Sequence, residues 1–311
     1  MIRCDMVKDA SSVVEYLRRD VLRNNYFLQA AEKNVPPVPR EIRAAVGPDG
    51  AMLGVMFVEE FPHGKMACVR ADSSAALRVL LGSLNPQETY GFVVQDDLRK
   101  EFLESVSNAD LRSETVAMTL APSEFCPFEI HGELRRLHVA DKALTDAFPE
   151  CGPHEPPLSS FVEWAENKPE SMAAFGLLAD GEIVSYVEFA AAVDNMWEVS
   201  MIRTRAEARR KGFAEAVLSY GSGELLREGM LPLYRVDQEN VASIKTARRE
   251  GRIIVSGHMQ DESAPVTNNK ASLRDSRRGT QEETIASIFR LCACLRVAQA
   301  GRTGRLEAAS R

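Results

Sequence analysis

The sequence lacks any run of apolar residues long enough to span a membrane. Its first residues, MIRCDMVKDASSVV, carry charges where a secretory signal needs an apolar stretch. Its cysteines and histidines are scattered without the short spacings of a metal site, and a disulfide framework is not expected in a chain of this size and context. We therefore expect a cytoplasmic protein with reduced thiols, no membrane segment and no bound metal.

The sequence has fewer basic than acidic residues, and its formal net charge at pH 7 is -7. An acidic balance argues against a nucleic-acid groove as the main surface of the molecule. The two tryptophans, Trp164 and Trp197, are interpreted as core or cleft packing rather than as a stacking platform for bases. We expect no nucleic-acid partner, and no motif specifies the oligomeric state.

The chain divides into two halves with a similar order of predicted elements. Apolar residues in the first half recur with helical and strand periods, and Pro48, Asp49 and Gly50 predict a hairpin turn. This half is predicted to contain a helix at 10–33, a hairpin within 42–60, a strand at 66–72, a helix at 73–84, a strand at 90–95, a helix at 96–106 and a closing strand at 114–121.

The second half repeats that order and contains the clearest hairpin of the chain, in which Asp180 and Gly181 supply the turn. The predicted strands are 133–139, 173–178, 183–191, 196–204, 231–238 and 252–259. The predicted helices are 140–148, 160–167, a helix that follows the 205–212 loop and ends at Gly229, and 240–251. Beyond residue 262 the sequence is polar and rich in turn formers, which is typical of disorder, with one amphipathic pattern at 282–300.

The stretch EARRKGFAEAVL places Arg209, Arg210 and Lys211 directly before Gly212 at the start of a predicted helix. A helix N-terminus leaves backbone N–H groups unpaired, and its dipole favours negative charge. Gly212 leaves room for a close approach, and Ala214 keeps the next turn small. A solvated turn is the alternative, but the position of the motif between a strand and a helix favours a diphosphate site.

The segment IRTRAEARRKGFAEAVLSY, followed by PLYRVDQENVASIKTARREG, resembles the acyl-CoA-binding core of the GNAT superfamily of N-acetyltransferases. It is most similar to the branch that contains the glycine N-acyltransferase-like enzymes. The specific part covers residues 196–252, and the fold-level resemblance covers 130–260. The resemblance implies a strand that lends its backbone to the pantetheine arm and a loop whose N–H groups hold the pyrophosphate. The implied cofactor-binding residues are Ile202, Thr204, Arg209, Arg210, Lys211, Gly212, Phe213, Ala214, Asn240 and Ser243.

Glu198 is the candidate catalytic residue. Acyl transfer from a thioester to an amine requires a neutral nitrogen, so a general base within hydrogen-bond reach speeds the reaction. Glu198 stands six residues before Thr204, where the similar enzymes place a glutamate proposed to be that base. A glutamate inside an apolar strand is costly unless it has a partner or a task, and the alternative is a glutamate on a solvent-facing edge.

Two positions depart from the family pattern. Many GNAT enzymes carry a tyrosine seven residues after the asparagine, where it can protonate the departing thiolate, and this chain has Ala247. The expected Gly-Phe pair is Gly251-Arg252, which puts an arginine where an aromatic residue would pack. A proton for the leaving group is then left to Ser243, Tyr234 or water.

These observations predict an α/β (α+β) protein with a mixed-sheet, GNAT-like acyltransferase domain at 130–262. A degenerate GNAT-like domain or another α/β domain is expected at 1–125, and a disordered tail with at most a short helix at 263–311. The expected activity is transfer of an acetyl or other acyl group from acyl-CoA to a primary amine of a small molecule or amino acid. The alternative is a non-catalytic, regulatory acyl-CoA-binding module. Because VRADSSAALRVLL has no glycine where phosphates would lie, we expect one CoA per chain.

Overall fold

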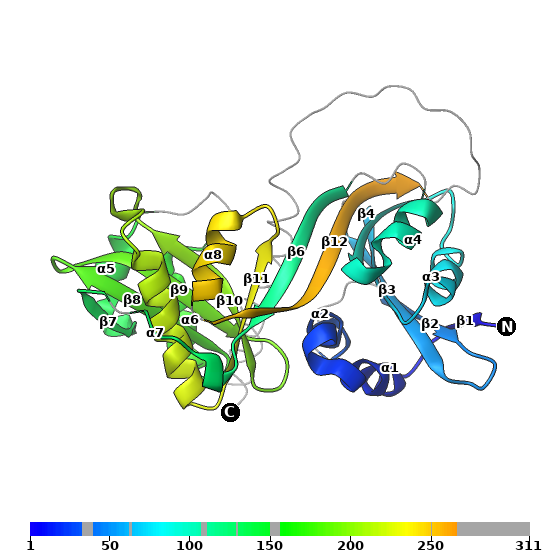
Figure 1. Cartoon of the computed structure of the whole chain (residues 1–311), viewed down its shortest axis with the longest axis horizontal. Helices are drawn as coiled ribbons and strands as arrows, with labels where there is room; N and C mark the ends of the chain where they lie inside the picture. Colours follow the sequence, from blue (N-terminus) through cyan, green and yellow to red (C-terminus); the bar gives the residue numbers. More distant parts are fainter. Residues whose placement is uncertain are drawn as a thin grey trace, which may run out of the picture. The chain divides into compact units, whose positions relative to one another are not determined.

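The structure, a computed structural model, describes residues 1–32, 40–61, 64–106, 111–128, 130–149, 156–249 and 251–265 (Figure 1). The described chain forms two compact units. Unit 1 consists of residues 1–118 with residues 235–241 and 254–265, and unit 2 of residues 119–234 with 242–253. Each unit has a mixed sheet with helices, so the expected mixed α/β class is confirmed. The predicted tail beyond residue 265 lies outside the described residues.

Unit 1 is built on a sheet with the strand order β1-β2-β3-β4-β5-β12-β6. All neighbours with a described register are antiparallel except β4 and β5, which are parallel. The strands are β1 (Arg3–Met6), β2 (Arg40–Val46), β3 (Met52–Phe61), β4 (Gly64–Ala71), β5 (Thr89–Gln95), β6 (Leu111–Thr119) and β12 (Ile253–Pro265). The helices are α1 (Ser11–Leu17), α2 (Val21–Glu32), α3 (Ser74–Leu81) and α4 (Arg99–Ser105), with 3-10 turns at Arg18–Asp20 and Asp96–Leu98.

The core of unit 1 lies between this sheet and α3 and α4. Met56, Val69, Leu77 and Phe92 belong to one cluster of buried residues there. Phe92 meets Phe102 of α4 edge to face, with ring centroids 5.1 Å apart. The strand and helix periods of the sequence correctly predict this layer, because both elements bury one face.

The single helix predicted at 10–33 is wrong, because a 3-10 turn at Arg18–Asp20 divides it into α1 and α2. The buried Asn24 side chain donates a hydrogen bond to the Leu17 carbonyl oxygen at 2.8 Å. An asparagine that competes for a backbone carbonyl in this way favours a break in the helical ladder. The short strand β1 was not predicted, because its sequence has no clear apolar alternation.

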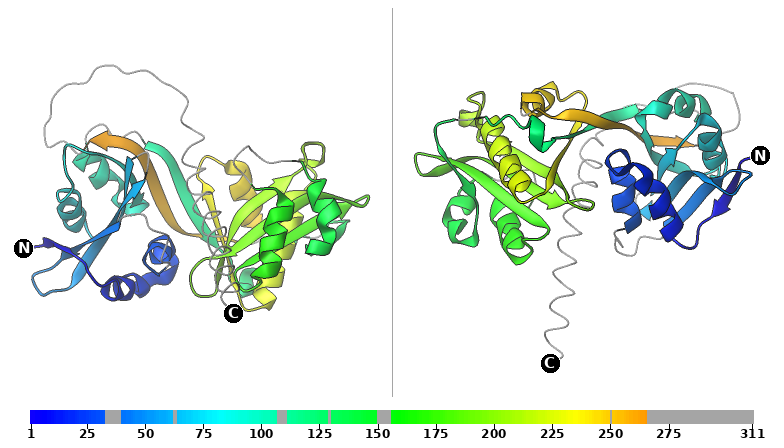
Figure 2. Two further views of the ribbon diagram at one scale, coloured as in Figure 1. Left: turned by 180° about the vertical axis from the view of Figure 1, so that it is seen from behind. Right: turned by 60° about the horizontal axis from the view of Figure 1, so that its bottom comes forward.

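Unit 2 has the strand order β11-β10-β9-β8-β7, in which β10 and β11 are parallel and the other neighbours antiparallel (Figure 2). Its strands are β7 (Glu133–Arg136), β8 (Met172–Ala179), β9 (Glu182–Ala191), β10 (Met196–Thr204) and β11 (Leu231–Asp237), of which β11 passes into unit 1 after Tyr234. Its helices are α5 (Lys142–Asp146), α6 (Leu158–Asn167), α7 (Phe213–Arg227) and α8 (Val241–Arg249), with 3-10 turns at Pro122–Glu124, Val139–Asp141 and Ala206–Ala208.

Helix α7 covers one face of the unit 2 sheet, and α5 and α6 cover the other. A Cβ atom on Gly221 of α7 would lie 2.8 Å from ring atoms of both Phe175 and Phe189, so a glycine is required for this close packing. On the opposite face, Phe161 of α6 and Tyr186 of β9 belong to a second cluster of buried residues. The predicted hairpin is confirmed, with Asp180 and Gly181 both at positive φ.

Candidate functional site

Strand β10 pairs with its parallel neighbour β11 only over its first three residues. The register between β10 and β11 covers Met196, Trp197 and Glu198, whereas β10 pairs with β9 as far as Thr204. The register with β9 shifts between Val199 and Met201, which makes Ser200 the extra residue of a β-bulge. The rest of β10, residues 199–204, therefore has a backbone edge that β11 does not pair.

The parallel strand pair of unit 1, β4 and β5, does not separate in the way that β10 and β11 do. Strands β4 and β5 pair without a shift from Lys65 to Val69 of β4. The helix that follows β4, α3, is capped by Ser73, whose hydroxyl accepts a hydrogen bond from the Ala76 N–H. Unit 1 thus offers neither an open strand edge nor an uncapped helix at this position.

In unit 2 the chain from β10 enters α7 through a left-handed loop. Arg210 has a φ of 62° and Gly212 has a φ of 83°. Gly212 is the N-cap of α7, and no side chain caps the helix there. A Cβ atom on Gly212 would lie 3.3 Å from two ring atoms of Phe128. The first-turn N–H groups of this 15-residue helix consequently have no side-chain acceptor at the N-cap. Unpaired N–H groups of this kind are what anion sites at helix N-termini use.

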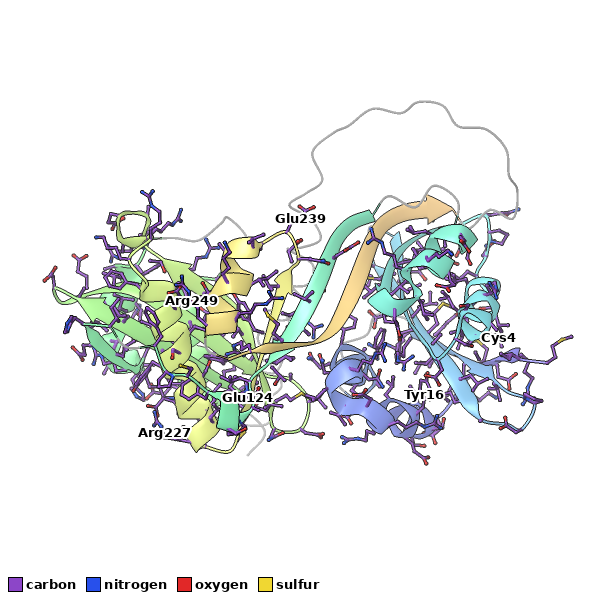
Figure 3. All side chains as sticks on the ribbon, in the orientation of Figure 1. Cys4, Tyr16, Glu124, Arg227, Glu239 and Arg249 are labelled. Atoms are coloured by element: carbon purple, nitrogen blue, oxygen red, sulfur yellow. The ribbon has the colours of Figure 1, made fainter. Side chains whose placement is uncertain are left out.

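The charges around this helix start also suit an anion. Arg209, Arg210 and Lys211 are exposed, and none of the three makes an ion pair within the described chain. The one acidic residue of the first turn, Glu215, pairs with Arg249 of α8, which is labelled in Figure 3. The pairing offsets the negative charge that would otherwise repel a phosphate.

Thr204 uses its hydroxyl within the sheet. Its Oγ1 lies 2.8 Å from Oγ of the fully buried Ser185 on β9. Its carbonyl oxygen accepts a long hydrogen bond, 3.4 Å, from Nε of Arg209. The structure thus connects Thr204 to the loop by its backbone and to β9 by its side chain. Ile202 on the same strand, and Phe213 and Ala214 in the first turn of α7, are half-buried.

Glu198 is the last residue of β10 in register with β11, where it pairs with Leu233. Its other cross-strand partner is Ala190, which in turn pairs with Met172, a member of the core cluster beneath α6. Directly paired residues share a face of a sheet, so Glu198 lies on the α6 face and is half-buried there. It therefore stands where the strand edge opens.

The two cofactor-binding residues expected near the start of α8, Asn240 and Ser243, belong to different units. Ser243 is half-buried and belongs to unit 2, as do the loop residues 209–214. Asn240 belongs to the segment that packs with unit 1. Ala247, which stands in the place of the family tyrosine, is fully buried.

Arg252 is buried, with 3% of its surface exposed. Its Nη2 donates to Oγ of Ser222 on α7 at 2.6 Å, and its Nη1 donates to the Pro232 carbonyl oxygen at 3.0 Å. The guanidinium also lies over the Tyr234 ring, 5.8 Å from the centroid. Arg252, which stands where the resemblance expects an aromatic residue, thus ties α7 to β11.

Sequence reasoning missed Glu188 on β9, a glutamate with 6% of its surface exposed. It pairs with Ala174 of β8 and with Met201 of β10, and both belong to or pack against the core cluster of the α6 face. The signal was present in the sequence, because IVSYVEFAA contains a glutamate inside an apolar strand, the same pattern that identified Glu198.

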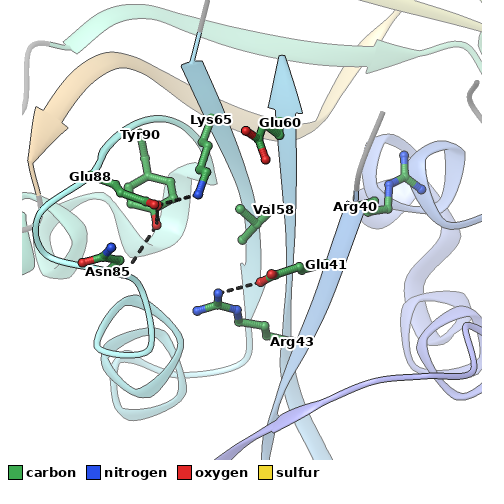
Figure 4. Close-up of a pocket in the computed structure, with 9 residues that line it drawn as sticks. All are labelled: Arg40, Glu41, Arg43, Val58, Glu60, Lys65, Asn85, Glu88 and Tyr90. Atoms are coloured by element: carbon green, nitrogen blue, oxygen red, sulfur yellow. Dashed lines mark hydrogen bonds and ion pairs between the residues drawn. The ribbon is translucent and has the colours of Figure 1, made fainter. Parts of the chain in front are cut away.

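A separate cavity of about 460 Å³ lies in unit 1 (Figure 4). Its charges are largely paired with one another. Lys65 Nζ lies 2.7 Å from Oε2 of Glu88, and Arg43 Nη2 lies 2.7 Å from Oε2 of Glu41. Hydrogen bonds donated by Lys65 and by Tyr90 to the Glu88 carboxylate lower the pKa of Glu88. The hydrogen bond between Lys65 and Glu88 also raises the pKa of Lys65. These internal pairs leave the lining without the excess of positive charge that a diphosphate needs.

The part of the chain that the structure describes contains no group of three or more side chains arranged to hold a metal ion. Across the same residues, no helix combines the length and the apolar character of a membrane span.

Comparisons with known proteins give one family match. Residues 137–251 match the model of the Acetyltransferase (GNAT) family, whose members use acetyl-CoA as co-substrate. No curated protein sequence matches the chain.

Solved structures extend the likeness over both units. An acetyltransferase of the GNAT family from Colwellia psychrerythraea has a TM-score of 0.56 at 12% identity, over 83% of this chain and 98% of that one. A GCN5-related N-acetyltransferase from Sphaerobacter thermophilus has a TM-score of 0.56 at 13% identity, over 85% of this chain and 95% of that one. A tandem GNAT protein from the clavulanic acid biosynthesis pathway has a TM-score of 0.55 at 12% identity, over 87% of this chain and 100% of that one. At such identities the likeness concerns the fold, and the match to the GNAT family model covers residues 137–251 of this chain.

Proposed function

We propose that unit 2 is an acyl-CoA-dependent N-acyltransferase that acylates a primary amine. The observation that carries the proposal is the combination of an open β10 edge with a left-handed, uncapped entry into α7. The residues fit a CoA: the unpaired strand edge matches an amide-bearing pantetheine arm, and the glycine cradle and exposed cations match a diphosphate. When bound, acyl-CoA supplies a thioester whose acyl group passes to the amine nitrogen, with release of the free thiol.

The residues of the chain have separate tasks in this proposal. The N–H groups at 212–214, with Arg209, Arg210 and Lys211, hold the diphosphate. The β10 backbone from Ser200 to Thr204 aligns the pantetheine arm. Thr204 fixes the strand to β9 through Ser185, and Ser243 faces the cofactor from α8.

Glu198 accepts the proton that the incoming ammonium must lose. Its place at the end of the β10–β11 register puts the carboxylate beside the open edge, where a thioester and an amine would meet. A half-buried base is less screened by water than an exposed one, so its charge acts more strongly on the ammonium. The proton for the departing thiolate comes from Ser243, from Tyr234 or from water, since Ala247 has none to give.

The acceptor is a small molecule with a primary amine, and the resemblance to the glycine N-acyltransferase-like branch puts amino acids among the candidates. The alternative function is a regulatory module that binds acyl-CoA without turning it over. Ala247 favours this alternative, because the position of the usual acid is occupied by a buried alanine.

Thiol release separates the two functions. Wild-type protein is incubated with acetyl-CoA and a panel of amino acids, aliphatic amines and amino sugars, and free thiol is followed with a chromogenic disulfide. CoA binding is measured in parallel by calorimetry. Turnover with at least one amine supports the enzyme; binding without thiol release from any amine would make the binding module the better description; and no binding at all would refute the site.

A further inference from the structure

The cavity of unit 1 lies between its sheet and the segment that follows α3 (Figure 4). Val58 of β3, a member of the buried cluster of unit 1, is an apolar part of its lining. Glu41 of β2 pairs with Val58, and Glu60 follows Val58 by two residues along β3, so all three share one face of the sheet. The volume of about 460 Å³ lies within the range of small-molecule sites, about 300–1,000 Å³.

Two cations of the lining have donors to spare. Figure 4 shows the ammonium group of Lys65 and the guanidinium group of Arg43 facing the same space from opposite sides. Lys65 Nζ donates one hydrogen bond, to Glu88, and an ammonium group has three N–H donors. The buried Nε of Arg43 has no hydrogen-bond partner within the described residues, and a buried donor without an acceptor is disfavoured. Carboxylate oxygens of a ligand would supply the missing acceptors.

Two carboxylates of the lining are open to a cation. Glu60 is exposed, and within the described residues it makes no ion pair or side-chain hydrogen bond. The Glu88 hydrogen bond is the main cause that raises the pKa of Lys65, and the negative charge of Glu60 acts in the same direction, so Glu60 faces the space that Lys65 faces. Glu41 is also exposed and contacts Arg43 through Oε2. Such carboxylates accept hydrogen bonds from an ammonium group.

We propose that this cavity binds a small zwitterion, a free amino acid. The proposed binding does not depend on the function proposed for unit 2. The ligand carboxylate lies between Lys65 and Arg43, and the ligand ammonium group lies beside Glu60. The lining has three basic and three acidic residues: Arg40, Arg43, Lys65, Glu41, Glu60 and Glu88. A balanced lining favours a ligand that carries both charges over a simple anion or cation, because each charge of the zwitterion meets its opposite.

The ion pairs already present in the lining do not block such a ligand. The side chains of Lys65 and Glu88 are 31% and 35% exposed, and that of Glu41 is 53% exposed. Ion pairs with this much exposure contribute little to stability, so a ligand can share or replace their hydrogen bonds at small cost. Val58 offers an apolar contact for the carbon atoms of the ligand.

The first test measures binding to the full-length protein without acetyl-CoA. L-Amino acids are titrated one at a time by calorimetry. The amino acid that binds best is compared with two analogues, the amine that lacks its carboxylate and the acid that lacks its amino group. Each analogue is expected to bind at least about tenfold more weakly, as for the loss of a charged hydrogen bond. Binding of no amino acid, or equal binding of either analogue, would overturn the inference.

Variants then locate the site. Glu60→Gln and Lys65→Met should each weaken binding at least about tenfold, and Glu60→Gln should keep the wild-type Tm because it breaks no ion pair within the described residues. Glu104→Gln and Lys100→Met remove exposed charges of α4 outside the lining and should keep wild-type affinity. Unchanged affinity in Glu60→Gln or Lys65→Met, or equal losses in the α4 variants, would place the amino acid elsewhere and overturn the inference. Because acetyl-CoA is absent, a failure of acyl transfer leaves these outcomes unaffected.

Discussion

Replacement of Gly212 by valine tests the phosphate loop at its narrowest point. Gly212 has a φ of 83°, and a Cβ there would lie 3.3 Å from two atoms of the Phe128 ring. A valine at this position relieves its strain by moving the free loop out of the left-handed conformation, and binding must restore that conformation at a cost of about 1–2 kcal/mol, a factor of about 5–30 in a binding constant. The contact with Phe128 adds to that cost. We therefore expect the CoA dissociation constant of Gly212→Val to rise at least about tenfold.

A matched control lies at the other end of the same helix. Gly229 has a φ of 79°, and nothing lies within 4 Å of its virtual Cβ. Gly229→Val therefore imposes similar backbone strain without touching the proposed ligand site. The assay is calorimetric titration of CoA into both variants at matched ionic strength, with Tm recorded for each. We expect both variants to lose stability and only Gly212→Val to lose affinity.

Two results would refute this reasoning. Unchanged CoA affinity in folded Gly212→Val would remove the loop from the binding site. Equal losses of affinity in the two variants would show that general destabilisation of α7, rather than the shape of its N-terminus, controls binding. If Gly212→Val does not fold, Gly212→Ala carries the same φ penalty with a smaller side chain and is expected to show the same direction of change.

Three other outcomes are expected. Glu198→Gln should lower turnover at neutral pH and saturating acetyl-CoA by about a hundredfold to ten-thousandfold with CoA affinity kept, and wild-type turnover across the pH range would exclude the base. Calorimetry should give one CoA per chain, because β4 and β5 are closed and Ser73 caps α3, and a stoichiometry of two would contradict this. Gly251→Ala should lower the free energy of unfolding by about 3 kcal/mol, because its Cβ would lie 2.1 Å from the Glu124 carbonyl oxygen. Gly181→Ala, whose Cβ has nothing within 4 Å, should lower it by only about 1 kcal/mol. Equal losses of the two variants in denaturant unfolding would refute the clash.

Local periodicity in the sequence predicted most of the elements. The predicted strand at 196–204 has the same bounds as β10, and the turn at Asp180 and Gly181 has the expected positive φ values. These features depend on neighbouring residues alone. The break between α1 and α2 depends on one side chain reaching a carbonyl seven residues away, which a helical period does not reveal.

The candidate site was predictable where a motif has a local meaning. Gly212 could be identified because a glycine between a strand and a helix has few other roles, and the structure gives it the left-handed conformation that an anion cradle uses. The opening of β10 from β11 was not predictable, because register depends on strands far apart in the chain. The hydrogen bonds of Arg252 were missed for the same reason, since Ser222 and Pro232 approach it only through the tertiary fold.

The placement of β12 has a consequence for how the protein is made. This strand comes after all the described strands of unit 2 along the chain, yet it pairs with β5 and brings His258 opposite Gln95. Contacts between such distant residues form late, because the loop between them must close first. During synthesis the β5 edge therefore stays without this partner until residues 254–265 have left the ribosome, by which time all the described residues of unit 2 have been translated. A fragment that stops at residue 125 would leave that edge unpaired, and an unpaired edge is a template for aggregation.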